Sequence, residues 1–519
     1  MSASREKKQR QGGTPSNKTL TAKQQADQTR RKTIEYTVIG AVIAVLVAAL
    51  LIWNSGVFQR GATAVTVGGT NYSVAEASYF YHSSYAYQLN TNQYYAAYLG
   101  YDTSKSPKDQ PYGEDGKTYH DYFLESAMED MSIITALYDA ALKDGMSAAD
   151  VKDDVDATIE SRKQDARQNG LSYGQYLKAV YGSYVTPSVF KECVTRSLVA
   201  SEYQERHKNG LDYTDEQLDA YYGEHKDELD TFEYSYLYFT PAAVETKDAD
   251  GNDIEMTDEE KKAKEELNLA EAKTKADGAA DAIRGGKSVA DAISEYEPAS
   301  SGEDTTSEGS SVSGVYAEWL KDAGRKAGDV TVVENSTYGY YVVVFGGRYL
   351  DETVSVNVRH ILVAAETSEG ASAPTEEQLA AAKAEAEDIL ARWKAGEATE
   401  ASFAAMADEL SDDGRDESGA LAAPGGLYEK VIPGNFVTPF NDWLFENGQH
   451  TPGDTGIIDV STGQRYSGYH VAYFVGENAG DYAWRYGVRD TLSSQDTQTW
   501  VEGLKEGYTA EQAGGAKYL

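Results

Sequence analysis

The segment Val356-Asn-Val-Arg-His-Ile-Leu-Val363 has the largely alternating pattern of a β-strand. A second segment of this kind, Phe232-Glu-Tyr-Ser-Tyr-Leu-Tyr-Phe239, lies 124 residues earlier. Two further pairs of segments follow in the same order: Glu318-Trp-Leu with Asp442-Trp-Leu, and Tyr338-Gly-Tyr with Ser467-Gly-Tyr. Three matched segments, 124 to 129 residues apart, indicate an internal repeat.

Each repeat has the order strand, long helix, short helix, polar loop and strand, which predicts an α+β fold. We assign the first repeat to residues 231–350 and the second to residues 354–478. In the second repeat, Thr375-Glu-Glu-Gln378 is a capping box that starts the long helix. Its apolar stripe, which would cover a sheet, is Leu379, Ala382, Ala386, Ile389 and Trp393. In the first repeat, the Ser- and Gly-rich segment 298–314 is predicted to be a mobile loop.

The N-terminal end of the chain has the pattern of a membrane anchor. Residues 1–33 contain nine basic and two acidic side chains, a net charge of +7. Residues 34–53 are mostly apolar and reach the roughly 20 residues that a membrane-spanning helix needs. The positive-inside rule places residues 1–33 in the cytoplasm and the bulk of the chain on the extracytoplasmic side. The alternative is a signal peptide cleaved near Ala62-Thr63-Ala64, but the apolar run is long and distant from that site, which favours an uncleaved anchor.

Helical sequence dominates residues 64–230, after a strand pair predicted at Ala64 to Ser73 with a turn at Gly68-Gly69. Residues 481–519 are predicted to be a C-terminal helix with a tail that is frayed or docked. The helical region carries many tyrosines, which fit helix packing or, alternatively, a peptide-binding surface. These tyrosines are Tyr79, Tyr81, Tyr85, Tyr87, Tyr94, Tyr95 and Tyr98.

Composition excludes several classes of function. The net charge is −37, with 47 basic and 84 acidic side chains, which argues against a nucleic-acid partner. The single cysteine, Cys193, excludes an intramolecular disulfide and a cysteine metal cluster. The acidic stretch Asp248 to Asp253 fits a calcium loop or a hairpin turn, and the missing distal Glu favours the turn. We therefore expect no metal and no cofactor.

Residues that could carry chemistry gather in the second repeat. His360 lies in its first strand, Ser411-Asp412-Asp413 follows its short helix, and His470 lies in its last strand. The motifs from Val356 to Val363, from Phe403 to Asp413, Phe436-Val-Thr-Pro-Phe440 and Ser467-Gly-Tyr-His470 resemble, in this order, the parvulin (rotamase) family of peptidyl-prolyl isomerases. The whole chain resembles the PrsA-type extracytoplasmic foldases and the related SurA-type chaperones, which implies that residues 64–230 form a helical chaperone domain.

The resemblance implies a catalytic site made of His360, Asp413, His470 and Ser467. It places the two histidines side by side in the sheet, Asp413 near the rotating carbonyl group, and Ser467 in the same polar network. Phe436 and Phe440 would hold the proline ring of the substrate. The site would lower a rotation barrier of about 18–20 kcal/mol about an Xaa-Pro bond without covalent chemistry.

The first repeat lacks these residues. His360 aligns with Tyr236, His470 with Tyr341 and Asp413 with Ala299, so the first repeat is expected to be a degenerate unit. The second repeat departs from the family pattern at Gly419-Ala-Leu-Ala422, where Gly-Asp-Leu-Gly is usual, and at Phe436, where Met or Leu is usual. The nearest basic side chains are Arg415 and Arg465, and phosphopeptide preference is not expected.

The sequence therefore predicts a membrane-anchored extracytoplasmic foldase that isomerises Xaa-Pro bonds in secreted or envelope proteins. Its partners would be unfolded or partly folded polypeptides and, through residues 34–53, the membrane; a homodimer is left open. One alternative is a non-catalytic holdase that uses both repeats as scaffold. Another is an envelope adhesion or assembly subunit that is indifferent to proline.

Overall fold

The computed structural model describes Thr37, Ala41, Ala44, Val45 and residues 56–519 apart from 92–99, 114, 248–253, 369–370, 416–418, 447–449 and 463–465. The basic segment 1–33, most of the predicted span 34–53, Tyr94, Tyr95, Tyr98, the acidic stretch 248–253 and Arg465 lie outside the described residues. Among the described helices, none combines the length and the apolar character that a membrane crossing requires. The anchor at residues 34–53 stays a prediction.

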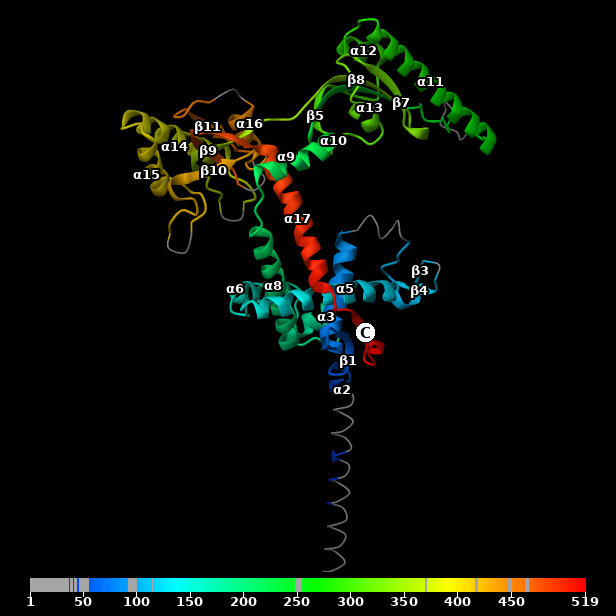
Figure 1. Cartoon of the computed structure of the whole chain (residues 1–519), viewed down its shortest axis with the longest axis vertical. Helices are drawn as coiled ribbons and strands as arrows, with labels where there is room; N and C mark the ends of the chain where they lie inside the picture. The colour runs from blue at the N-terminus through cyan, green and yellow to red at the C-terminus, as the bar shows by residue number, and fades with distance from the viewer. Residues whose placement is uncertain are drawn as a thin grey trace, which may run out of the picture. The chain divides into compact units, whose positions relative to one another are not determined.

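The chain folds into two compact units. One comprises Met1–Leu211 with Ser493–Leu519, and the other comprises Asp212–Leu492. The last helix, α17 (Ala483–Lys505), contributes its first ten residues to the second unit and the rest to the first (Figure 1). The C-terminal segment, which the sequence suggests is separate, is therefore shared between the two units.

The first unit is mainly helical. Its elements are α2 (Val57–Arg60), β1 (Thr63–Val67), β2 (Thr70–Ser73), α3 (Val74–Thr91), β3 (Pro111–Tyr112), β4 (Lys117–Thr118), α5 (Tyr119–Lys143), α6 (Lys152–Gln168), α7 (Tyr173–Tyr181), α8 (Pro187–Asn209) and β13 (Ala510–Gln512). The predicted hairpin with its turn at Gly68-Gly69 is confirmed, because both glycines have a positive φ and β1 pairs with β2. β13 pairs with the other edge of β1, so the C-terminal tail is docked.

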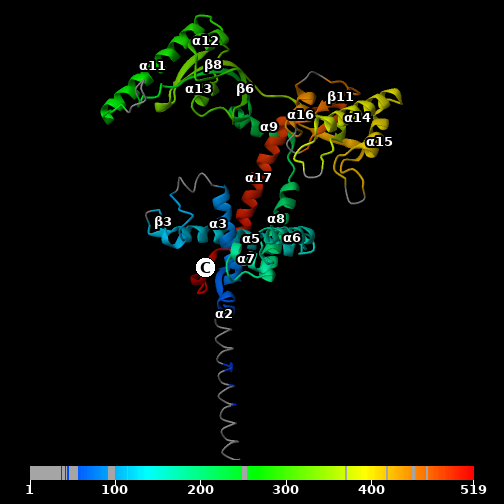
Figure 2. The same ribbon diagram turned by 180° about the vertical axis from the view of Figure 1, so that it is seen from behind.

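Aromatic packing dominates the interior of this unit. Figure 2 shows α6 and α7 near the C-terminal end of α5 and β3 near its N-terminal end. Tyr81 is buried and Tyr79 and Tyr85 are partly buried in the clusters that join α3 to α5 and α8, whereas Tyr87 is exposed. For these described tyrosines of α3, packing accounts for all but Tyr87.

The second unit holds two four-stranded antiparallel sheets of the same order, β6-β5-β8-β7 and β10-β9-β12-β11. After α9 (Asp215–Glu224) and α10 (Lys226–Leu229), the first repeat comprises β5 (Thr231–Phe239), α11 (Asp258–Arg284), α12 (Val289–Tyr296), β6 (Ser300–Glu308), α13 (Ala317–Lys321), β7 (Val330–Glu334) and β8 (Tyr340–Tyr349). The second repeat comprises β9 (Val354–Ala364), α14 (Glu376–Ala395), α15 (Glu400–Leu410), β10 (Leu427–Val431), α16 (Thr438–Phe445), β11 (Thr455–Asp459) and β12 (Gly468–Tyr482).

Strand register confirms the internal repeat. In the first repeat Tyr236 pairs with Val343, and in the second His360 pairs with Ala472. These positions are 124 and 129 residues apart, which are the spacings of the matched sequence segments. The two repeats therefore share strand order and central register.

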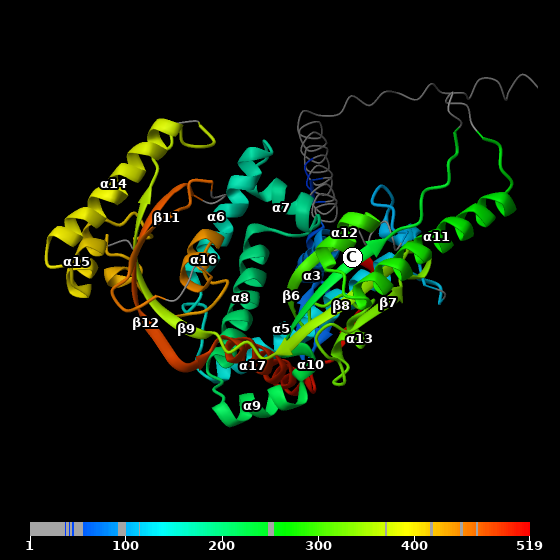
Figure 3. The same ribbon diagram turned by 90° about the horizontal axis from the view of Figure 1, so that it is seen from above.

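The second repeat places its helices on opposite faces of the sheet. Successive side chains of a strand point to opposite faces. Ile361, Val363, Val471 and Tyr473 pack against α14 and α15, and the predicted stripe is buried there at Ala382, Ala386, Ile389 and Trp393. Val356, Val358, Ala472 and Phe474 pack against α16. Figure 3 shows α14 and α15 on one side of β9 and β12 and α16 on the other.

The segment 298–314 of the first repeat is not the mobile loop that its composition predicts. Ser300–Glu308 forms β6, which pairs along β5 from Tyr238 to Thr231. Without β6, the backbone N–H and C=O groups along one edge of β5 would have no hydrogen-bond partners in the sheet. The antiparallel pairing with β6 gives them these partners. Tertiary context therefore outweighs the low β-propensity of this Ser- and Gly-rich sequence.

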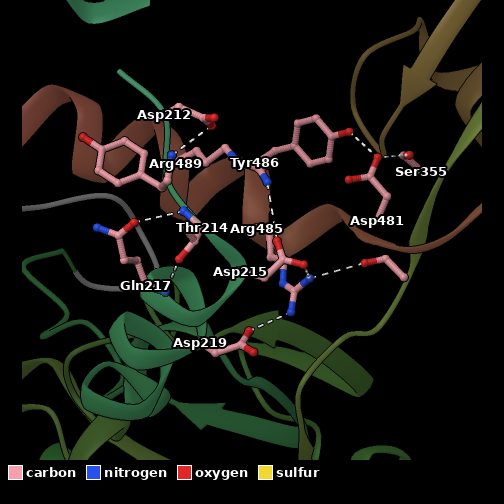
Figure 4. Close-up of polar contacts among 12 residues, drawn as sticks. Asp212, Thr214, Asp215, Gln217, Asp219, Ser355, Asp481, Arg485, Tyr486 and Arg489 are labelled. Carbon is pink, nitrogen blue, oxygen red and sulfur yellow. Dashed lines mark hydrogen bonds and ion pairs between the residues drawn. The ribbon is translucent and has the colours of Figure 1, made fainter. Parts of the chain in front are cut away.

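The start of α17 is bound to α9 within the second unit. Figure 4 shows the Arg485 guanidinium group directed at Asp219 and Asp215, at 2.8 Å and 2.9 Å. Close by, Asp481 at the end of β12 accepts hydrogen bonds from Ser355 of β9 and from Tyr486. These contacts join the end of the second repeat to the helix that precedes the first.

Candidate active site

Two histidines form the centre of the candidate site. His360 on β9 and His470 on β12 are diagonal neighbours, because His360 pairs with Ala472 and His470 pairs with Leu362. Their Nδ1 atoms are 2.8 Å apart, so one imidazole donates a hydrogen bond to the other. Both side chains face α16, and each residue is 2% exposed. The structure thus brings together the two histidines that the resemblance pairs.

The end of α15 positions the acidic residue. Ser411 is buried, and its hydroxyl oxygen accepts hydrogen bonds from the backbone N–H groups of Leu362, at 3.1 Å, and Asp413, at 3.2 Å. The backbone N–H of Asp412 donates to the carbonyl oxygen of Leu362. These bonds attach the loop to β9 and bring Oδ2 of Asp413 to 3.4 Å from Nε2 of His360.

Two tyrosines that sequence reasoning missed complete the polar chain. The Tyr428 hydroxyl donates to Oδ2 of Asp413 at 2.7 Å, and the Tyr466 hydroxyl lies 2.9 Å from Nε2 of His470. The excess of tyrosine over phenylalanine, 39 against 12, indicates hydroxyl groups that need partners. That signal does not say which tyrosines lie at the site.

Ser467 does not occupy its predicted place. Its carbonyl oxygen accepts a hydrogen bond from the backbone N–H of Ala365, which continues the pairing of β12 with β9. Among the described residues, no hydrogen bond links its hydroxyl group to the histidines. The hydroxyl that reaches His470 belongs to Tyr466, one position earlier.

Burial and hydrogen bonding set the charges of the site. The His360 imidazole beside it, 3.4 Å away, and the hydrogen bond from Tyr428 hold the pKa of Asp413 well below its usual range, although burial opposes them. Burial, followed by the neighbouring His360, lowers the pKa of His470 to about 3. Burial, followed by the bond to Asp413, raises the pKa of Tyr428. At neutral pH the site therefore holds one carboxylate, a neutral His470 and a protonated Tyr428.

Aromatic rings cover the histidines. Phe440 is fully buried, and its ring stacks on His470 with centroids 5.2 Å apart and planes at 12°. Phe436 is half-buried, with its ring edge-to-face against Phe440 at 4.5 Å and against His360 at 5.8 Å. Of the two predicted ring-binding residues, Phe436 presents its surface to solvent and Phe440 lies behind it.

Arg415 is the basic residue nearest the acidic loop Ser411-Asp412-Asp413, and its side chain is held by hydrogen bonds to backbone carbonyl groups. The Arg415 guanidinium donates to the carbonyl oxygens of Gly419, Asp408 and Ser411. It therefore organises the loop rather than offering a free cation. Over the described ranges, no group of three or more His, Cys, Asp or Glu side chains is placed to hold a metal ion.

The corresponding positions of the first repeat carry tyrosines. The rings of Tyr236 and Tyr341 lie with centroids 6.1 Å apart, and Tyr341 stacks on Tyr238 at 4.1 Å. The backbone N–H of Ala299 donates to the carbonyl oxygen of Tyr238, as that of Asp412 does to Leu362. Ala299 therefore corresponds to Asp412, and the sequence alignment with Asp413 is wrong by one residue.

The comparison with known families bears on this region. Residues 347–472 match the family model described as the PPIC-type PPIASE domain. This segment contains the second-repeat strands β9 and β10, the two histidines and Asp413, and the match confirms the resemblance that the sequence motifs indicate. The PPIase domain covers about a quarter of the chain.

Other comparisons add little. No curated protein matches the chain. One similar solved structure comes from work on two SurA-like chaperones of Campylobacter jejuni, the virulence factor PEB4 and a structurally related periplasmic protein. It is 15% identical, covers 55% of this chain and 82% of its own, and has a TM-score of 0.12, too low to support an argument.

Proposed function

We propose that the second repeat catalyses cis–trans isomerisation of Xaa-Pro bonds in unfolded secreted or envelope polypeptides. One observation carries the proposal: a buried histidine pair lies beside a charged carboxylate and a half-exposed phenylalanine, within the PPIase domain. The proline ring would lie against Phe436, while Phe440 forms a rigid support behind it.

Burial divides the roles within the site. The histidines are 2% exposed and do not reach a bound peptide, whereas the Asp413 side chain is 29% exposed. We therefore assign Asp413 as the catalytic group and the histidines as positioning residues that hold it.

The charge of Asp413 gives a reason for rate enhancement. Resonance places partial negative charge on the carbonyl oxygen of a planar amide, and twisting the bond removes much of it. A carboxylate beside that oxygen repels the planar forms more than the twisted one, so the barrier falls in both directions. No bond to the enzyme forms in this scheme.

We also propose that residues 34–53 anchor the protein in the cell membrane, with residues 1–33 in the cytoplasm. The basic segment followed by the uncharged, largely apolar residues 36–53 supports this orientation. The clients would then be polypeptides that fold outside the cytoplasm.

The test measures isomerisation of a proline tetrapeptide by the full chain and by His360→Ala and Asp413→Ala. We expect both variants to lose most of the activity, and His225→Ala, on the loop between α9 and α10, to retain it. Wild-type activity in both His360→Ala and Asp413→Ala would contradict the proposed site.

A non-catalytic holdase is the second candidate. The first repeat supports it, because the sheet is kept there while tyrosines replace both histidines. Under that function, a folded wild-type chain suppresses aggregation of an unfolded client but does not isomerise the tetrapeptide. Under the proposed function, Asp413→Ala loses isomerisation and keeps aggregation suppression.

A further inference from the structure

We propose that the first repeat binds a short extended segment of an unfolded polypeptide in a groove beside the N-terminal part of α11. The groove has a volume of about 700 Å³ and is lined by residues 241–246, by α11 and by Thr337-Tyr338. α11 packs on the opposite face of the sheet from the positions that correspond to the active site. The inference rests on the proposed function for its class of client, and it adds a second place where the foldase holds that client.

The helix of the groove is longer than its counterpart in the second repeat. Ala272 is the first buried residue of α11, and Ala382 is the first of α14. Residues 258–271 of α11 precede Ala272, whereas only residues 376–381 of α14 precede Ala382. At 3.6 residues per turn, α11 therefore begins about two turns earlier. Figures 1 and 2 show this end of α11 extending beyond the strands of its sheet.

The groove is made from this extension and from a longer connection. Residues 240–257 join β5 to α11, whereas residues 365–375 join β9 to α14. The helical residues that line the groove lie between Lys261 and Leu269, within the extension, and a second wall is part of the longer connection. The sheet that both repeats share does not require either segment, so the first repeat has gained a surface where the second has none of this length.

Hydrogen bonds hold two walls of the groove in place. The side-chain amide of Asn268 on α11 donates to the carbonyl oxygen of Ala242 at 2.8 Å. On the other side, the Tyr238 hydroxyl donates to the carbonyl oxygen of Tyr338 at 2.8 Å, and the Asn335 amide donates to the Tyr238 hydroxyl at 3.3 Å. The groove is therefore preformed, which lowers the ordering cost of binding a flexible segment.

The lining favours an apolar occupant. Pro241, Val244 and Leu269 are half-buried apolar residues of the groove. Tyr338 is 70% exposed, although its backbone is held by Tyr238. A fixed, exposed aromatic ring beside apolar walls suits an apolar or aromatic side chain of a partner.

Charge and size narrow the partner further. The rim on α11 carries two ion pairs: Lys261 with Glu265 at 3.9 Å, and Lys262 with Glu266 at 4.0 Å. These pairs cancel, in a chain whose net charge is −37, so the rim neither repels acidic segments nor selects an anion. About 700 Å³ is within the range of sites that enclose a ligand. The occupant is therefore a few side chains of an extended segment rather than a folded domain.

The test places a photoreactive benzoylphenylalanine in the full chain in place of Tyr338. The control carries it in place of Tyr349, which is 45% exposed on β8 and does not line the groove. The probe is reduced and carboxymethylated α-lactalbumin, an unfolded polypeptide. We expect about tenfold more cross-linking to the probe at position 338 than at position 349, because apolar contacts concentrate in the groove.

A matched pair of substitutions tests the groove itself. Ala243→Glu puts a carboxylate into the apolar wall, and Ala263→Glu adds the same group to an exposed position of α11 that does not line the groove. We expect Ala243→Glu to lower cross-linking at position 338 about fivefold and Ala263→Glu to stay within about twofold. Circular dichroism verifies that both variants fold.

The outcomes separate the groove from the proposed isomerase. Cross-linking of the probe no stronger at position 338 than at position 349, or equal effects of the two glutamates, would overturn the inference. An adduct at position 338 with the mass of two copies of the chain would overturn it in favour of a second copy. Cross-linking in the groove by a chain that does not isomerise the proline tetrapeptide would support the groove and contradict the isomerase. Isomerisation without cross-linking would overturn the groove alone.

Discussion

Replacing Asp413 by asparagine tests the charge of the site while keeping its shape. Oδ1 of Asp413 accepts the backbone N–H of Gly414 at 3.0 Å, while Oδ2 accepts Tyr428 and faces His360. The asparagine side chain has only one oxygen atom. Its NH₂ group must therefore face either the backbone N–H of Gly414 or the Tyr428 hydroxyl and His360. A hydrogen bond to a charged group is worth about 1.5–3 kcal/mol, and a loss of about 2 kcal/mol lowers kcat/KM about 30-fold.

The assay follows isomerisation of a proline tetrapeptide by the full chain, with circular dichroism to verify folding. The neighbouring Asp412→Asn is the matched control, because its carboxylate accepts from the backbone N–H of Ala364 at 3.0 Å and does not contact the histidines. We expect the control to stay within about twofold of wild type. A folded Asp413→Asn with wild-type activity, or an equal loss in both variants, would refute the role of this charge.

Three other predictions concern stability and location. The pKa of His470 is about 3 in the folded chain, whereas an unfolded histidine binds a proton below about pH 6.5. The free energy of unfolding should therefore fall by about 1.4 kcal/mol per pH unit from pH 6.5 toward 3. Urea unfolding at pH 6.5 and 5 should show a smaller fall for His470→Gln than for the wild type. Gly426→Ala should lower the free energy of unfolding by more than about 1 kcal/mol in thermal denaturation, since Gly426 has φ +65° and a Cβ atom would lie 2.2 Å from the carbonyl oxygen of His360. Removal of residues 1–53 should move the protein from the membrane fraction to the soluble fraction.

Much of the strand arrangement in the second unit could be predicted. The strand segments that recur in both repeats indicate corresponding positions in two similar sheets, and alternation within each strand indicates which residues share a face of the sheet. Alternation places Val356, Val358 and His360 on one face of β9. The 129-residue spacing of the last strands predicts that His470 on β12 has the same place in the second repeat as Tyr341 on β8 has in the first. β6 could not be predicted, because Ser300–Glu308 lacks strand-like composition and becomes a strand by pairing with β5.

The candidate site could be predicted where residues lie on strands and less well where they lie on loops. The pairing of the two histidines is what the family resemblance implies, and both lie in segments whose sequence pattern indicates strands. Asp413 reaches His360 because Ser411 binds the backbone of β9, a contact that no periodicity reveals. Tyr466 and Ser467 are adjacent, and choosing between them requires the direction in which the chain enters β12.

The two repeats show that the sheet and the site are separable. The sheet depends on backbone pairing and on its two apolar clusters, and tyrosines replace the histidines in the first repeat without a change of register. The acidic loop is different, because it needs room at the edge of the sheet. In the second repeat β10 starts to pair at Arg359, and Asp413 can turn toward His360.

In the first repeat β6 pairs from Tyr238 onward, the position that corresponds to Leu362. Ser300, which corresponds to Asp413, is therefore held in the edge strand. Histidines at Tyr236 and Tyr341 would still lack a neighbouring carboxylate, because Ser300 stands at the position of Asp413. The absence of a free acidic loop, more than the absence of the histidines, therefore separates the first repeat from a catalytic unit.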